Sequence, residues 1–141
     1  MSDQTIGAFV DAVRRGDGAR VREALAADVV LNSPIVADPI TGPAAVSGIL
    51  GLLAGVLGDL TFGEVLVGDS SHAVRLTGRI GERDIEAIEH LRLNADGEVD
   101  SITVLARPLE SVVALQNRLA STLGMPPLSL VAARSGEAGE R

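Results

Sequence analysis

The chain of 141 residues lacks cysteine, lysine, tyrosine and tryptophan altogether, and it has only two phenylalanines. The missing cysteine excludes disulfide bonds, thiolate catalysis and cysteine-ligated zinc. The scarcity of aromatic rings leaves almost nothing to stack on nucleic-acid bases, and the net charge of -7 repels a phosphate backbone. These features exclude nucleic acid from the expected partners.

Signals for metals, cofactors and membranes are equally sparse. The two histidines, His72 and His90, stand apart from any carboxylate cluster, so we expect both at the surface and no metal site. No phosphate loop or dinucleotide fingerprint occurs, which predicts a chain without a cofactor. The longest uncharged run, 39–58, holds prolines and glycines, and it fits a buried helix better than a membrane span. Because residues 1–15 mix charges into their apolar pattern, unlike a signal peptide, the expected location is cytoplasmic.

Apolar residues are abundant, at 46% of the chain with a mean hydropathy of +0.30. A chain of this length can bury a core within one domain. The apolar excess predicts either a large apolar pocket or a face covered by a partner, and a homodimer would satisfy the second. We expect a single domain over residues 1–124 and a flexible tail over 125–141.

The order of predicted elements favours an α+β fold with a mostly antiparallel sheet. Short helices are expected on either side of Gly16, the first capped by Asp3 and the second by Asp17. The remaining pattern predicts a strand, a helix, four strands joined by short turns and a last helix, over residues 28–33, 43–57, 60–67, 72–80, 83–93, 99–106 and 109–123. The last helix is expected either to cover the open end of the sheet as a lid or to form a dimer contact.

Three segments of the chain resemble the ketosteroid isomerases, a branch of the nuclear transport factor 2-like superfamily that is related to the SnoaL-like cyclases. They are the end of the first helix at 9–17, the strand, loop and helix start at 27–46, and the hairpin at 88–99. The resemblance implies a cone-shaped, curved sheet packed on the N-terminal helices, in a cystatin-like roll. It also implies an apolar pocket and a small apolar ligand.

The resemblance extends unevenly to the residues of the isomerase reaction. That reaction requires a carboxylate base and hydrogen-bond donors for the developing enolate oxygen. Ser33 stands where the family has its aspartate base, and Phe9 stands where it has its donor tyrosine. Glu89 matches the family's second donor, a carboxylic acid that an apolar site keeps protonated. Since loss of the base alone slows such a reaction roughly 10²–10⁴-fold, ordinary isomerase activity is not expected.

Glu89 is the candidate catalytic residue because of its place in the strand over 83–93. It alternates in step with the apolar residues of that strand, so its carboxyl is expected to point toward the interior with a raised pKa. The alternative is a structural acid that pairs with Arg75 or Arg107.

The pair Asn32 and Ser33 supplies a second set of candidates. The two residues lie on opposite faces of one strand, so one of them is expected to face the pocket and bind a ligand or a water molecule. The alternative is turn chemistry before Pro34.

Four further side chains are candidates for the pocket wall or its mouth. Phe9 and Phe62 are expected in the core or along the wall, and Arg75 and Arg107 either contact a ligand or remain surface charges.

The sequence favours the binding of a small hydrophobic molecule, with the usual isomerase base and tyrosine replaced. Two alternatives stay open. One is a cofactor-independent isomerase, cyclase or epoxide-hydrolase-like enzyme that uses Glu89 as acid or base. The other is a non-catalytic dimerisation module whose cavity is filled by its own side chains.

Overall fold

The computed structural model describes residues 2–132, which form four helices and six strands. In chain order these elements are α1 (Ser2–Arg15), α2 (Gly18–Ala24), β1 (Leu25–Asn32), β2 (Ile40–Thr41), α3 (Pro43–Val56), β3 (Gly58–Val67), β4 (Ser71–Ile80), β5 (Arg83–Leu93), β6 (Val99–Arg107) and α4 (Leu109–Leu123).

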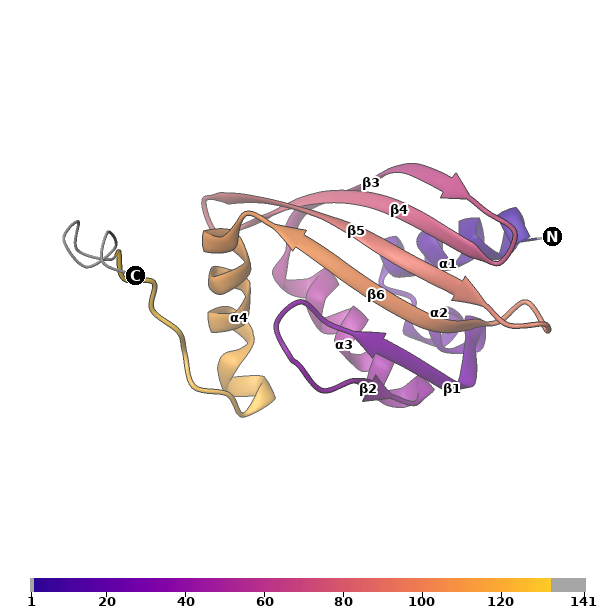
Figure 1. The fold of residues 1–141 in the computed structure, drawn as a ribbon, viewed down its shortest axis with the longest axis horizontal. Coiled ribbons are helices and arrows are strands. Elements are labelled where there is room, and N and C mark those ends of the chain that lie inside the picture. The colour runs from indigo at the N-terminus through magenta and orange to yellow at the C-terminus, as the bar shows by residue number, and fades with distance from the viewer. Residues whose placement is uncertain (1, 133–141) are drawn as a thin grey trace, which may run out of the picture.

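The strands form one mixed sheet in the order β2-β1-β6-β5-β4-β3. Within it β1 and β6 run parallel, and the other neighbouring strands are antiparallel. Figure 1 shows the long strands β3 to β6 arching over α1, α2 and α3, while α4 stands across one end of the arch. The predicted α+β roll with a curved, mostly antiparallel sheet is confirmed.

The ends of several elements differ from the predicted ones by a few residues. β1 begins at Leu25 rather than at residue 28, because Leu25 and Ala26 are already buried where the chain leaves α2. The short β2, Ile40–Thr41, was not predicted, since two residues are too few to show an alternating pattern.

The two predicted N-caps have different outcomes. Asp17 caps α2 as expected, and its carboxylate accepts a hydrogen bond from the backbone N–H of Arg20 at 3.2 Å. Asp3, however, lies inside α1, because that helix already begins at Ser2.

The segment that follows α4 lies along this helix as far as Leu128. Gln116 Nε2 donates a hydrogen bond to the carbonyl of Pro126 at 3.0 Å. Asn117 exchanges two hydrogen bonds with the backbone of Leu128, at 2.8 and 2.7 Å. The tail predicted for 125–141 is therefore bonded to α4 over its first residues, and residues 133–141 of that prediction lie outside the described residues.

Apolar packing occurs in two clusters on the inner face of the sheet, which is the face toward α1, α2 and α3. The larger cluster joins this face to the three helices, with Phe9, Leu31 and Leu91 among its fully buried members. The second cluster joins α4 to α3 and to the β4–β5 hairpin, and its buried members are Ile80, Ile85, Leu115 and Leu119. The second cluster closes the end of the arch at which α4 stands.

Removal of a core side chain should destabilise the fold far more than removal of an exposed one. Leu91 is 0% exposed and Leu109 is 64% exposed. We expect Leu91→Ala to lower the free energy of unfolding by about 3 kcal/mol, because it removes buried methyl groups and leaves a void. Leu109→Ala should change it by about 0.5 kcal/mol or less. Urea unfolding at 25 °C measures both values, and equal losses would contradict the assignment of the core.

Candidate functional site

A cavity of about 60 Å³ lies between the inner face of the sheet, α3 and α4. Its wall is almost entirely hydrocarbon and draws on every layer of the fold, with Leu53 from α3, Phe62 from β3, Val104 from β6 and Leu115 from α4. Both apolar clusters therefore contribute to the same wall.

Glu89 brings a carboxyl group into this apolar wall. It lies in the middle of β5, opposite Val74 on β4 and Val104 on β6, and it is 7% exposed. Its Oε2 atom has no hydrogen-bond partner among residues 2–132. Burial in hydrocarbon disfavours the charged form and raises the pKa of Glu89 to about 7. Near neutral pH the group is therefore divided between a carboxylic acid and a carboxylate.

The arginines proposed as partners of Glu89 bind a different acid. Arg75 Nη2 lies 2.8 Å from Glu86 Oε2, and Arg107 Nη1 also donates to the carboxylate of Glu86. These three residues occupy the outer face of the sheet, which is the face away from α1, α2 and α3. The hydrogen bond from Arg75, followed by that from Arg107, holds the pKa of Glu86 below its usual range. Glu89 is thus left without a cationic partner, and both arginines lie away from the cavity.

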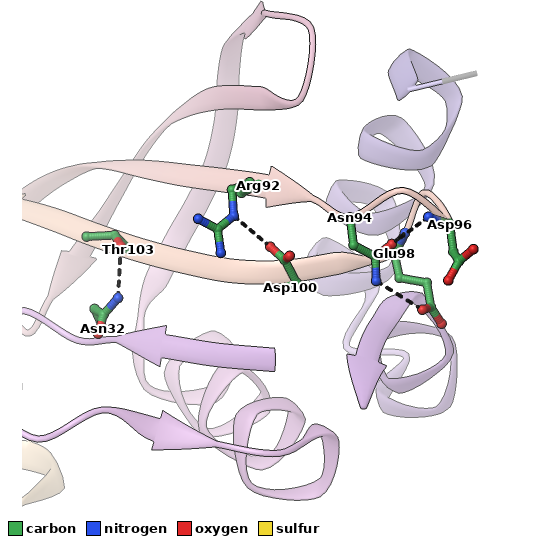
Figure 2. Close-up of polar contacts among 7 residues, drawn as sticks. All are labelled: Asn32, Arg92, Asn94, Asp96, Glu98, Asp100 and Thr103. Carbon is green, nitrogen blue, oxygen red and sulfur yellow. Dashed lines mark hydrogen bonds and ion pairs between the residues drawn. The ribbon is translucent and has the colours of Figure 1, made fainter. Parts of the chain in front are cut away.

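Asn32 and Ser33 do not contribute to the lining of the cavity formed by the described residues. The parallel register sets Asn32 beside Thr103, and Asn32 Nδ2 donates to Thr103 Oγ1 at 3.1 Å on the outer face (Figure 2). Ser33 Oγ accepts a hydrogen bond from the N–H of Ile35 at 3.2 Å. This is the turn-forming role given above as the alternative to ligand binding.

The two phenylalanines have different positions. Phe62 lines the cavity from β3. Phe9 is 1% exposed and belongs to the larger apolar cluster, so within residues 2–132 it is a core residue and lies outside the cavity wall.

A hairpin with its own polar bonds holds Glu89 in register. At the turn between β5 and β6, Asn94 Oδ1 accepts hydrogen bonds from the N–H groups of Asp96 and Glu98, at 3.0 and 2.9 Å. Further along the same pair of strands, Arg92 Nε lies 3.0 Å from Asp100 Oδ1 (Figure 2). Because a shift of one residue would move Glu89 to the outer face, these bonds matter for the site as well as for the fold.

Sequence reasoning missed two features of the inner face. His72 was expected at the surface but is 2% exposed, and neither ring nitrogen has a hydrogen-bond partner among residues 2–132. Its alternation with Val74 and Leu76 on β4 is the signal that would have placed it inside. The contribution of Leu115 to the cavity was also missed, because no local pattern shows where a helix docks.

Within residues 2–132, no group of three or more histidine, aspartate or glutamate side chains is arranged to hold a metal ion. In the same part of the chain, no helix combines the length and the apolar character needed to cross a membrane.

Solved structures with the same architecture define the class of protein. A protein of Silicibacter pomeroyi DSS-3 with a cystatin-like fold has a TM-score of 0.81 at 24% identity, covering 85% of each chain. A steroid Δ-isomerase of Pseudomonas aeruginosa has a TM-score of 0.78 at 28% identity, covering 87% of this chain and 94% of that one. The curved sheet over three helices is the fold of the nuclear transport factor 2-like superfamily.

Sequence comparison narrows the class. A steroid Δ-isomerase of Nocardioides simplex is 30% identical over 112 residues, which are 77% of this chain and 91% of the relative. No protein-family model matches the chain. The chain belongs to the steroid Δ-isomerase family of the nuclear transport factor 2-like superfamily, and the predicted resemblance is confirmed.

The raised pKa of Glu89 predicts a specific pH dependence of stability. Between its usual value of 4.5 and about 7, the folded protein keeps a proton that the unfolded chain has lost. The free energy of unfolding should therefore fall by about 3 kcal/mol as the pH rises through this window, and it should level off above it. Glu89→Gln removes this contribution.

Urea unfolding of both proteins at pH 5 and pH 8 tests the prediction. The loss of stability between the two pH values should be larger in the unmodified protein than in Glu89→Gln. Equal losses would show that Glu89 ionises at the same pH in the folded and unfolded states.

Proposed function

We propose that this protein binds a small apolar molecule in the cavity and that an oxygen atom of this molecule pairs with the Glu89 carboxyl. One observation carries the proposal: a buried carboxyl oxygen without a partner projects from an apolar wall beside a cavity. Relatives named as steroid Δ-isomerases, which by name act on an apolar substrate, support it.

An unpaired buried polar atom is unfavourable by roughly 1–3 kcal/mol. A ligand that supplies a carbonyl or hydroxyl group at Glu89 recovers part of this free energy, while its hydrocarbon part is sheltered from water. The protonated carboxyl is a donor and suits a carbonyl oxygen, in the way that the apolar site of ketosteroid isomerase uses a protonated acid. The proposed ligand is therefore a hydrocarbon with one polar end.

Catalysis is the second candidate, and it has its own supporting observation. A group with a pKa of about 7 can both give and take a proton near neutral pH, as general acid–base catalysis requires. Glu89 would serve this role in a cofactor-independent isomerisation, cyclisation or epoxide opening. The positions of the family base and tyrosine hold Ser33, bonded in a turn, and Phe9, buried in the core. For this reason we rank ligand binding above turnover.

Two substitutions at Glu89 separate binding from catalysis. Glu89→Leu removes the polar group and should weaken binding of a small ketone, such as cyclopentanone, about tenfold or more. Glu89→Gln keeps a donor and should bind within about threefold of the unmodified protein, but it should abolish any proton transfer. Binding to the unmodified protein should weaken above about pH 7, as the carboxyl ionises, and binding to Glu89→Gln should not.

Nuclear magnetic resonance titrations at pH 6 and pH 8 measure these affinities, and Glu82→Gln, in the exposed turn between β4 and β5, is the matched control. If Glu89→Leu binds as tightly as the unmodified protein, the assignment of the site is wrong. If Glu89→Gln retains turnover of a candidate ketone, lactone or epoxide, Glu89 is not the acid or base.

We also propose that two copies of the chain associate through the outer face of the sheet. Ile88 and Leu105 are paired across β5 and β6 on this face, and they are 38% and 65% exposed. They line a groove of about 380 Å³ together with Arg75, Glu86 and Arg107. A patch that carries both signs of charge beside apolar side chains is self-complementary under a two-fold axis, as a symmetric dimer requires.

An acidic side chain in the middle of this patch should separate the two copies. We expect the unmodified protein to sediment as a dimer and Leu105→Asp to sediment as a monomer at the same concentration, because the substitution buries a charge at the interface. Leu109→Asp, on the exposed side of α4, is the control and should remain a dimer. A monomeric unmodified protein would refute the proposal.

A further inference from the structure

The helix α4 stands across one end of the arch (Figure 1) and contributes to the wall of the cavity. Figure 1 shows it standing between the turn of the β4–β5 hairpin and the loop that follows β1. Its inner side packs against Ile80 and Ile85 of that hairpin and against Ile35 of that loop. Near its first turn, Ser111 Oγ donates a hydrogen bond to the carbonyl of Asp84 at 2.6 Å. The helix is thus attached both to the β4–β5 hairpin and to the loop that follows β1.

The closed cavity is small for the class of ligand that the family name suggests. A volume of about 60 Å³ holds a few water molecules, since each needs about 10–15 Å³. Pockets that enclose a drug-sized ligand measure roughly 300–1,000 Å³. A molecule of four fused rings therefore does not fit while α4 is in place.

One leucine of α4 lines the cavity and the next one does not. Leu115 belongs to the wall formed by the described residues, whereas Leu119, one turn further along the helix, does not. Both leucines are buried, with exposed fractions of 4% and 2%, and both belong to the cluster that attaches α4. The two residues therefore share an anchoring role, and of the two only Leu115 also lines the cavity that contains Glu89.

We propose that Leu115 limits the size of the ligand: it restricts the site at Glu89 to compact, single-ring ketones and related small carbonyl compounds, and it excludes those with a second ring. This inference rests on the proposed function, because it assigns a ligand class to the same cavity. A smaller residue at position 115 would enlarge the cavity, and a larger one would fill it.

The experiment compares a compact and a large ketone on matched variants. Cyclopentanone and the two-ring ketone 2-decalone are titrated at pH 6 into the unmodified protein, Leu115→Ala and Leu119→Ala. We expect cyclopentanone to bind all three within about threefold. 2-Decalone should bind Leu115→Ala at least tenfold more tightly than it binds the unmodified protein or Leu119→Ala.

A third variant guards against misfolding. If a leucine-to-alanine change destabilises the protein too far, Leu115→Phe leaves no void, and it should abolish cyclopentanone binding while a folded spectrum is retained. Unchanged cyclopentanone binding by a folded Leu115→Phe protein would overturn the proposal.

The remaining outcomes separate this inference from the function on which it rests. Binding of 2-decalone to the unmodified protein as tight as to Leu115→Ala would overturn the size limit, and sensitivity of that binding to Glu89→Leu would leave the binding site standing. Failure of both ketones to bind any variant would reject the proposed function, and the size limit with it.

Discussion

The burial of one carboxyl group without a partner is the constraint on which the site depends. Hydrocarbon surrounds Glu89, and Arg75 and Arg107 hold Glu86 on the opposite face. Desolvation then acts alone on the inner acid, and its pKa rises to about 7. The same sheet therefore carries two glutamates three residues apart with opposite pKa shifts, one raised by burial and one lowered by ion pairs.

The alternation of side chains along β5 produces this difference. Residues 86 and 89 differ by an odd number of positions, so they project from opposite faces. The polar turn at Asn94 and the ion pair between Arg92 and Asp100 fix the register of the hairpin, and hence the face on which each acid lies. Local bonds at one end of the hairpin thus determine the charge state of a group near its middle.

Sequence patterns were sufficient for most of the fold because each strand and helix shows its period locally. The alternation in β5 also placed Glu89 inward correctly. Residues whose position depends on a neighbouring strand were less accessible. The face of Asn32 is set by its parallel alignment with Thr103, which lies 71 residues away in sequence. Leu115 approaches the cavity through the docking of a whole helix, and no property of its own segment reports that contact.

The parallel pairing of β1 with β6 has a consequence for the emerging chain. β1 is the first strand to be synthesised, and it can pair with β6 only after β6, the last strand of the sheet, has been made. Until then the apolar side of β1 has no completed sheet to join, and contacts between such distant segments form slowly. Cotranslational folding of this small domain must therefore wait for almost the entire polypeptide, and a chain stalled before β6 would expose an unpaired edge to its neighbours.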